Sequence, residues 1–313
     1  MRSCCIYYWD NSVGVKVDSS LIKECLDPFF ECIIFDFSIT KDNNTDIFNY
    51  LPSNKFDIGI FVQNYEVNLL EHNKINVYIV NEEWLSLKEI SNFDKFDYII
   101  VKNSYAKNLL FDLHNNINVL YFWSRDLYHQ KYSSIKNKNI LHFAGKSIQK
   151  NTESLLDNTS VHIFDSTGRF KDVRPENYYT DYISDNKLQR VFNTCDTHIC
   201  PSLYEAHGHY MYEGLLCNKN IIASDIPPWS EQIDPDYINF IDTPKTVIYN
   251  KDYNFLSSEF SDSTCHPLRR GFLINKDEML ECVKSPKNKK PRKYILSLFQ
   301  KNKESFINFF TNL

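Results

Sequence analysis

Short apolar runs alternate with longer stretches of helical spacing along most of the chain. Segments such as 19–26 and 105–113 carry apolar residues three and four positions apart, which predicts amphipathic helices. Between such segments lie the runs that we predict as strands. They cover residues 4–8, 32–37, 57–62, 76–80, 98–101, 119–122, 140–144, 161–164, 197–200, 221–224, 238–241 and 272–274. Because strands alternate with helices, the pattern predicts an α/β protein with parallel sheets.

One polar stretch, residues 128–139, interrupts this alternation and is the predicted linker. A chain of 313 residues is long enough for two ordinary domains. We therefore expect two Rossmann-like, doubly wound domains that face each other across a cleft. Residues 1–135 would form the first domain and residues 136–293 the second, and a final amphipathic helix would cover about 294–313.

Composition narrows the class of protein. A hydrophobic content of 42% supplies packed cores, and the net charge of −5 argues against a nucleic-acid-binding surface. No run approaches the roughly 18 apolar residues of a membrane span, so we predict no transmembrane segment. The nine cysteines are odd in number and form no CxxC pairs, which indicates reduced thiols. With no secretory signal in the first residues, these features predict a cytoplasmic protein, and they leave its oligomeric state open.

The candidate site lies in residues 200–228. Two glutamates, Glu205 and Glu213, bracket Gly208, one of only seven glycines in the chain. The hydrophobic pattern places Glu205 in a loop after a strand, Gly208 just before a helix and Glu213 about one turn inside that helix. In open α/β sheets, ligands bind beyond the carboxyl ends of strands, against helix amino termini. Gly208 would let the backbone approach a ligand, and the free N–H groups of the first helical turn favour an anion such as a diphosphate.

The two carboxylates suit an extended ligand that carries hydroxyl groups. Glu205 and Glu213 would be offset by about 5 to 8 Å along the helix, which is far enough to hold different hydroxyl pairs. A nucleotide sugar has this shape, with a ribose diol, a diphosphate and a sugar. The alternative is that two glutamates at this spacing arise by chance, in which case Glu213 is a solvated helix carboxylate. The surrounding pattern favours the site.

The same stretch resembles the E-x7-E signature of retaining GT-B glycosyltransferases of the group 1 (family 4-like) kind. The common form of that signature is PSxxEGFGxxxxEA, followed by an apolar strand and a proline. The matching residues are Pro201, Ser202, Glu205, Gly208, His209, Tyr210, Glu213, Pro227, Pro228 and Glu231. Ala206 and His207 stand where the family usually has Gly-Phe.

A second segment, residues 140–156, resembles the strand and loop that open the carboxyl-terminal domain of these enzymes. Gly145 is followed by Lys146, and Lys150 stands a few positions later, where the family has basic residues. The alternative is that Lys146 and Lys150 are ordinary surface lysines; the fact that both positions match the family argues against it. The letters GKS also end a phosphate-binding P-loop, but that motif requires a glycine where Ile140 stands.

The resemblance implies a GT-B fold, a nucleotide-sugar substrate and transfer to a glycan or other hydroxyl acceptor with retention of configuration. It implies no metal and no cofactor. The family's second glutamate, here Glu213, binds the ribose diol, and its first, here Glu205, binds the transferred sugar. The basic residues Lys146 and Lys150 neutralise the diphosphate together with the amides near Gly208.

Further expectations follow from the same resemblance. Residues 178–202 resemble the approach to the signature, where the nucleobase lies against the backbone; a plain strand end is the alternative there. The last helix would cross back onto the amino-terminal domain. Uridine and guanosine diphosphate sugars both remain open as donors. The donor-side residues that these expectations add are Gly145, Tyr182, Ile183, His207, His209 and Tyr210.

Two metal-binding alternatives are present in the sequence. His207 and His209 form an H-x-H pair, but no third ligand lies at helical spacing. Asp234 and Asp236 form a D-x-D, which binds manganese in the other large glycosyltransferase fold, although the proline between them predicts a turn. A metal-dependent transferase that uses this pair is therefore one rival hypothesis. The chain has no GxGxxG and no GxSxG, which disfavours a nicotinamide enzyme and a hydrolase.

The amino-terminal half carries weaker signals. Strand ends deliver four polar segments, residues 11–14, 81–84, 102–105 and 123–126, to one edge of the predicted sheet, and the last three faintly resemble the same family. We expect acceptor contacts there, with Gly14 allowing a loop to approach the donor. The acceptor-side residues are Gly14, Asn81, Glu82, Ser124 and Asp126. The second rival hypothesis is an inactive sugar-binding or scaffold protein that kept the fold.

Overall fold

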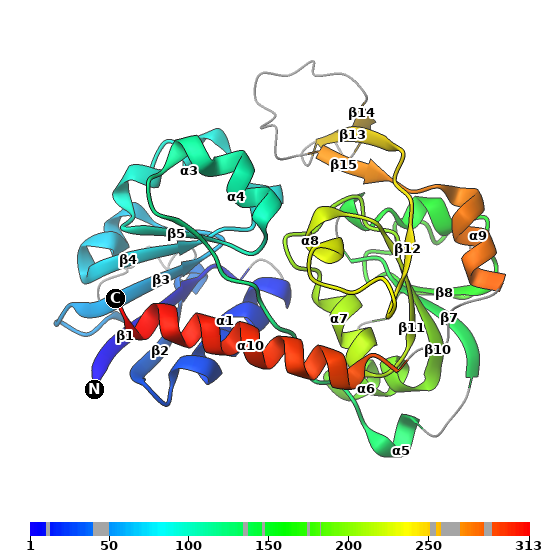
Figure 1. The fold of residues 1–313 in the computed structure, drawn as a ribbon, viewed down its shortest axis with the longest axis horizontal. Helices are drawn as coiled ribbons and strands as arrows, with labels where there is room; N and C mark the ends of the chain where they lie inside the picture. Colours follow the sequence, from blue (N-terminus) through cyan, green and yellow to red (C-terminus); the bar gives the residue numbers. More distant parts are fainter. Residues whose placement is uncertain are drawn as a thin grey trace. The chain divides into compact units, whose positions relative to one another are not determined.

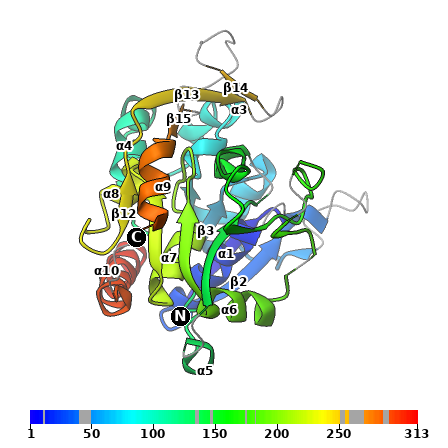
Figure 2. The ribbon, with the colours of Figure 1, turned by 90° about the vertical axis from the view of Figure 1, so that its right-hand side faces the viewer.

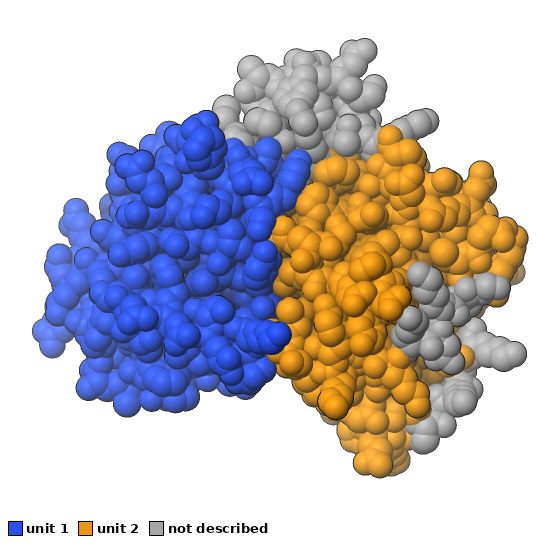
Figure 3. Space-filling model, in the orientation of Figure 1, with its two compact units in different colours: residues 1–123, 300–313 blue, residues 124–299 orange. Residues whose placement is uncertain are grey.

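The computed structural model describes residues 1–10, 13–39, 50–133, 137–145, 148–173, 176–181, 183–250, 255–257, 270–284 and 290–313. The chain forms two compact units. Unit 1 comprises Met1–Trp123 and Gln300–Leu313, and unit 2 comprises Ser124–Phe299 (Figures 1 and 3).

The division between the units differs from the one expected at residue 135. The chain enters unit 2 at Ser124, before the predicted linker, residues 128–139. The reason is packing: Leu127 is buried with Phe192 and Cys217 of unit 2, so the segment around it belongs to that core. The polar stretch itself contains a short helix, α5 (Gln130–Ser133).

Unit 1 is built on a parallel sheet with the strand order β2-β1-β3-β4-β5-β6. Its strands are β1 (Arg2–Tyr8), β2 (Phe30–Asp36), β3 (Phe56–Val62), β4 (Asn73–Ile79), β5 (Tyr98–Val101) and β6 (Ile117–Val119). Its helices are α1 (Val13–Leu26), α3 (Leu87–Ile90), α4 (Ser104–Leu110) and the end of α10 (Arg292–Thr311). Its 3₁₀ turns are η1 (Phe37–Ile39), η3 (Val67–His72), η4 (Glu82–Trp84), η5 (Phe93–Lys95) and η6 (Phe111–Leu113).

The central strands of this sheet are buried, which explains why they are continuous apolar runs in the sequence. Tyr7 of β1 is fully buried and stacks on Phe61 of β3, with ring centroids 4.5 Å apart. Its hydroxyl donates to Asn73 Oδ1 at 3.0 Å. A Cβ at Gly59 would lie 2.3 Å from the Asn73 amide, so β3 has space only for glycine there. Strands buried on both faces are typical of parallel sheets, and this is why no polar alternation marks them.

Unit 2 contains a second parallel sheet with the order β12-β11-β10-β7-β8-β9. Its strands are β7 (Asn137–Phe143), β8 (Val161–Phe164), β9 (Tyr178–Tyr179), β10 (Cys195–Cys200), β11 (Asn220–Ser224) and β12 (Asn239–Ile241). The helical elements are η7 (Ile148–Lys150), η8 (Thr152–Leu155), α6 (Asp185–Thr194), α7 (His209–Leu216), α8 (Pro227–Ser230) and α9 (Lys276–Lys284). Helix α9 packs against β11 and β12, with Met279 in their core (Figures 1 and 2).

A third, antiparallel sheet was not predicted. It has the order β14-β13-β15, with β13 (Lys245–Asn250), β14 (Phe255–Ser257) and β15 (Arg270–Leu273). The run 272–274 was expected as a strand in the alternation of parallel strands and helices. It lies in β15, which pairs with β13 in an antiparallel arrangement, and antiparallel strands can be joined without a crossover helix. Phe272 N donates to Leu203 O at 2.7 Å, so this sheet adjoins the loop that carries Glu205.

One predicted strand is misplaced along the chain. The run 119–122 was expected as a strand, but β6 is Ile117–Val119 and pairs with Ile99–Val101 of β5. Leu120 N still donates to Val101 O at 3.0 Å, and β5 ends at that residue, so the chain beyond has no strand to pair with. The expected α/β class with two Rossmann-like parallel sheets is confirmed.

Helix α10 begins in unit 2 and ends in unit 1. In unit 2, Tyr294 donates its hydroxyl hydrogen to Gln232 O at 3.0 Å. In unit 1, Asn302 Nδ2 donates to Phe122 O at 2.9 Å, and the buried Phe306 contacts Trp123 with ring centroids 5.2 Å apart. Neither α10 nor any other helix in the described part of the chain combines the length and the apolar character needed to cross a membrane.

Candidate functional site

The sheet of unit 2 reverses its winding direction between β7 and β10, and ligands of doubly wound folds bind at this point. The loops that follow the two strands lie side by side there. Leu203 N, after β10, donates to Gln149 O, after β7, at 2.8 Å. Tyr204 O accepts a second bond from the Gln149 side chain. The two segments of the sequence that we singled out for a nucleotide sugar are therefore neighbours.

Glu205 lies at this junction and is only 6% exposed. Its Oε1 accepts hydrogen bonds from Lys150 Nζ and, at 2.7 Å, from Ser202 Oγ. The Ser202 hydroxyl also bonds the Tyr210 hydroxyl at 2.7 Å, and the Lys150 ammonium lies 4.2 Å from the centre of the Tyr210 ring. A buried carboxylate needs such partners, because an unpaired charge out of water is costly.

Tyr210 contributes a neutral hydroxyl to this cluster. Burial raises its pKa well above the ordinary value, and the neighbouring Cys200 and Glu205 raise it further. The cluster therefore contains one cation, one anion and two neutral hydroxyls. Such a group can accept from ligand hydroxyls through Glu205 and offer positive charge to a phosphate through Lys150.

Gly208 has a backbone φ of +78°, and it precedes the first residue of α7. A Cβ there would lie 2.8 Å from the ring of Trp229, which is fully buried and donates Nε1–H to His207 O at 2.8 Å. Both the conformation and the contact require glycine. This explains why the chain places one of its few glycines between two histidines. Gly145, with a φ of +61°, is a second such position beside Lys150.

His207 and His209 share one partner, Ser124. The Ser124 hydroxyl lies 2.9 Å from His207 Nε2 and 2.9 Å from His209 Nδ1. Because a hydroxyl has one hydrogen, it donates to one ring nitrogen and accepts from the other when both rings are neutral. His207 also stacks on Tyr212, with centroids 4.5 Å apart. The structure thus places Ser124, which we expected on the acceptor side, with the donor-side histidines.

Glu213 is 3% exposed, so the alternative of a solvated helix carboxylate is wrong. Its Oε1 accepts from Arg125 Nε at 3.0 Å, and Arg125 Nη1 lies 3.6 Å from Asp185 Oδ1 at the start of α6. Sequence reasoning missed Arg125, although it named both neighbours, Ser124 and Asp126. The available signal was that a buried glutamate requires a cation.

Asp126 pairs with Arg292 at the start of α10. Both carboxylate oxygens accept from the guanidinium at 2.6 Å. Burial raises the Asp126 pKa, but the hydrogen bonds from Arg292 and from the Tyr128 backbone N–H, together with the positive charge of Arg292, outweigh burial, and the net pKa is lowered. In this structure Asp126 anchors a helix, and its expected acceptor contact stays a prediction.

The remaining acceptor-side candidates lie in unit 1. Glu82 is fully buried after β4 and accepts from Asn103 Nδ2, after β5, at 2.5 Å. Asn81 Nδ2 donates to the Gln63 side chain at 2.8 Å, and Gly14 lies in the first turn of α1. Glu82 and Asn103 thus tie together two strand ends at the carboxyl edge of the sheet. Their contact with an acceptor stays a prediction.

Two of the donor-side candidates, Lys146 and Tyr182, lie outside the described residues. Ile183 is half-buried and directly precedes Ser184, the N-cap of α6. The base-binding role assigned to this segment stays a prediction.

Asp234 and Asp236 are on the opposite edge of the sheet from Glu205. They precede β12, at the amino end of a parallel strand, whereas Glu205 follows the carboxyl end of β10. Asp234 Oδ1 accepts from Asp236 N at 2.8 Å, which confirms the predicted turn. Within the described residues, no three His, Cys, Asp or Glu side chains are grouped so that they could hold a metal ion.

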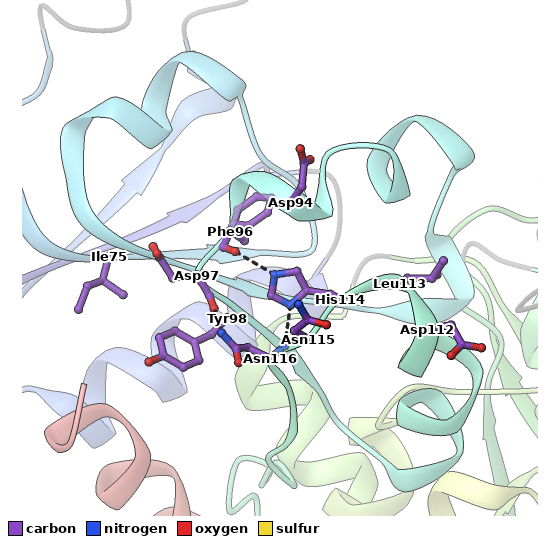
Figure 4. Close-up of a pocket in the computed structure, with 10 residues that line it drawn as sticks. All are labelled: Ile75, Asp94, Phe96, Asp97, Tyr98, Asp112, Leu113, His114, Asn115 and Asn116. Atoms are coloured by element: carbon purple, nitrogen blue, oxygen red, sulfur yellow. Dashed lines mark hydrogen bonds between the residues drawn. The ribbon is translucent and has the colours of Figure 1, made fainter.

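A depression of about 590 Å³ in unit 1 lies apart from these candidates (Figure 4). Ile75, Asp97 and Asn116, at or before the amino ends of β4, β5 and β6, contribute to its lining. His114 also lines it, and both of its ring nitrogens are bonded, Nε2 to Phe96 O at 3.0 Å and Nδ1 to Asn116 N at 3.1 Å (Figure 4). Because this depression lies at the amino edge of the sheet, it is not part of the candidate acceptor site at the carboxyl edge.

Comparison with solved structures identifies the fold. Sucrose-phosphate synthase from Thermosynechococcus elongatus superposes with a TM-score of 0.65 at 9% identity, covering 99% of each chain. Anabaena Alr3699/HepE in complex with UDP and glucose has a TM-score of 0.64 at 12% identity, covering 99% of this chain and 100% of its own. An α,α-trehalose-phosphate synthase (UDP-forming) from Burkholderia vietnamiensis has a TM-score of 0.64 at 7% identity, with coverages of 100% and 96%.

Sequence comparison adds a family match for one part of the chain. Comparison with curated proteins gives no significant match. Residues 170–250 match the family described as "Glycosyl transferases group 1", and this region includes both Glu205 and Glu213. The chain therefore has the GT-B fold, and its residues 170–250 match the model of the family described as "Glycosyl transferases group 1".

Proposed function

We propose that this protein is a retaining, metal-independent glycosyltransferase that moves a sugar from a UDP-sugar or GDP-sugar to a hydroxyl group of a glycan or other acceptor. The observation that carries the proposal is the cluster of Lys150, Glu205, Ser202 and Tyr210 at the carboxyl ends of β7 and β10. The cluster lies where doubly wound folds bind their ligands, next to Gly208, which directly precedes α7.

The charges of the site match the parts of a nucleotide sugar. Glu205 and Glu213 are buried carboxylates that accept hydrogen bonds, which suits the hydroxyls of the transferred sugar and of the ribose. Lys150 and the positive end of the α7 helix dipole, just after Gly208, suit the diphosphate of such a ligand. Alr3699/HepE, a protein of the same fold, has been solved with UDP and glucose.

The proposed chemistry uses charge that develops as the bond between the sugar and the diphosphate breaks. Negative charge grows on the departing phosphate oxygen, and Lys150 with the α7 amides stabilises it more than it stabilises the ground state. The same oxygen accepts the proton of the acceptor hydroxyl, which attacks from the face that the diphosphate leaves, and configuration is retained. Lys150 forms an ion pair with Glu205, and we expect a bound donor to draw this lysine toward its phosphates.

Thermal unfolding with a panel of nucleoside diphosphates and their sugars tests the proposal. We expect one diphosphate to raise the melting temperature by several degrees, and chelator not to change that rise. Consumption of the matching nucleotide sugar, dependent on an added acceptor, would establish transfer. A shift that chelator abolishes would favour a metal-dependent enzyme. Binding without consumption would favour an inactive scaffold, and no shift with any nucleotide would contradict the proposal.

A further inference from the structure

Glu213 is held by a residue that lies far from it in the sequence. Arg125 Nε donates to Glu213 Oε1 at 3.0 Å, across 88 positions of the chain, and the Arg125 side chain is 27% exposed. Its Nη1 lies 3.6 Å from the exposed Asp185 at the start of α6. The guanidinium therefore contacts both the glutamate expected to bind the ribose and the start of α6, which follows the segment expected to bind the nucleobase.

The segment that carries Arg125 is anchored on both sides. Ser124 bonds both His207 and His209, at 2.9 Å each. On the other side, Asn193 of α6 donates its amide hydrogen to Leu127 O at 2.6 Å and accepts from the backbone N of residue 129 at 2.9 Å. These bonds fix the backbone around Arg125 against α6 and α7. The Arg125 side chain therefore loses little conformational entropy when it bonds to Glu213.

We propose that Arg125 is a positioning residue that holds the Glu213 carboxylate in place for the ribose hydroxyls of the nucleotide donor. A carboxylate has two oxygens, so a bond from Arg125 to Oε1 orients the group and leaves Oε2 as an acceptor for a ligand hydroxyl. This inference rests on the proposed function. It adds that recognition of ribose depends on a residue outside the family-matched region, since Arg125 precedes residues 170–250.

A purely structural role is the competing explanation, because any buried carboxylate needs a cation nearby. The two explanations differ in what happens to ligand selectivity. If Arg125 only neutralises Glu213, its removal lowers stability and weakens ribonucleotide and deoxyribonucleotide binding by the same factor. If it positions Glu213, its removal selectively weakens binding of the ligand that has the 2′-hydroxyl.

The test is a cycle of protein and ligand changes. The probe is whichever of UDP, GDP and ADP most stabilises the wild type, compared with its 2′-deoxy counterpart by calorimetric titration. A hydrogen bond to a charged group should make the wild type prefer the ribose form by about 10- to 100-fold. In Arg125→Gln we expect that preference to fall to about threefold or less. Arg190→Gln, which changes an exposed arginine of α6, should keep the wild-type preference.

Each outcome decides between the explanations. An Arg125→Gln protein that keeps the wild-type preference overturns the inference and leaves the proposed function intact. A wild type that binds no nucleoside diphosphate overturns the proposed function and the inference with it. If Arg125→Gln does not fold, Arg125→Lys carries the test, because it keeps the charge but lacks the planar fork. An intermediate preference supports positioning, and an unchanged one contradicts it.

Discussion

Glu205 and Glu213 are alike in burial and charge but differ in their partners. Glu205 is paired with Lys150, which a diphosphate can attract away, and Glu213 is paired with Arg125. An arginine keeps its charge and its planar geometry under all ordinary conditions, whereas a lysine is a flexible point charge. The site therefore combines one exchangeable ion pair with one that is held in place.

Lys150→Ala should reduce turnover more than it reduces donor affinity, because in the proposed mechanism the lysine stabilises charge that appears as the bond breaks. The expected loss in kcat is at least about tenfold, which corresponds to roughly 1.5–3 kcal/mol for a charge-assisted bond. Steady-state kinetics with the donor varied would measure it. Lys284→Ala removes an exposed lysine that pairs with Glu281 at 2.7 Å and serves as the control, with no expected change in kcat. A wild-type kcat in Lys150→Ala would contradict the assigned role.

Gly208→Ala should destabilise the protein and weaken nucleotide binding, because the new Cβ meets the buried Trp229 ring and the backbone has a positive φ. Gly168→Ala separates these two causes. Its φ is also positive, +66°, but its Cβ would lie 3.5 Å from Thr180, an ordinary contact. We expect the strain alone to cost about 1 kcal/mol in Gly168→Ala, and Gly208→Ala to cost clearly more. Equal losses in urea denaturation would show that the Trp229 contact does not matter.

At the scale of elements, α10 is held by different side chains along its length. Its early residues bond to unit 2 through Arg292 and Tyr294, and its later residues bury Phe306 and Phe310 in unit 1. Apolar residues at this spacing lie on one side of a helix, which is why the amphipathic pattern could be read from the sequence. Which neighbour each turn contacts could not be read from it.

Phe306→Ala should destabilise unit 1 by about 3–5 kcal/mol, because it removes a fully buried ring that packs on Phe122 and Trp123. Denaturation followed by tryptophan fluorescence suits this variant, since Trp123 is one of its neighbours. Leu296→Ala is the matched control on the same helix. Leu296 is 42% exposed, and its truncation should cost well under 1 kcal/mol. A small loss for Phe306→Ala would mean that α10 does not hold unit 1 together.

At the scale of the whole molecule, buried titratable groups link stability to pH. His198 of β10 is almost fully buried, with Nε2 2.6 Å from Cys195 Sγ. Burial, together with the positive charge of Lys219, lowers its pKa from 6.5 to about 3. Between about pH 6.5 and pH 3 the unfolded chain therefore binds a proton that the folded protein does not. The folded protein holds this histidine in its neutral form. The free energy of unfolding therefore decreases progressively as the pH falls through that window.

His198→Gln should flatten this pH dependence. One such proton changes the free energy of unfolding by at most about 1.4 kcal/mol per pH unit, and the variant lacks that contribution. Urea denaturation at pH 6.5, 5.5 and 4.5 would give the slopes for both proteins. The slope is the decisive quantity, because the substitution also changes packing against Phe192 at every pH. Equal slopes would show that another group, and not His198, takes up the proton.

The amino-acid sequence alone predicted the α/β class, the parallel strands and the position of the donor-side loop. Strands buried on both faces, such as β1 and β3, contain continuous apolar runs, and Gly208 has a positive φ that other residues rarely adopt. These are local properties, because each depends on the chemistry of adjacent residues. The sequence also resembled a family whose match over residues 170–250 was then found.

Only the tertiary structure decided which residues face the two glutamates. Arg125 is 88 positions from Glu213, and Lys150 is 55 from Glu205, so no periodicity connects them. The tertiary structure also shows that Ser124, which we expected at the acceptor edge, bonds the two histidines. It places the boundary between the units at Ser124 and pairs β15 with β13. Partners of this kind are set by how strands and loops pack together. A sequence shows that a buried charge needs a partner, but the fold selects which one it gets.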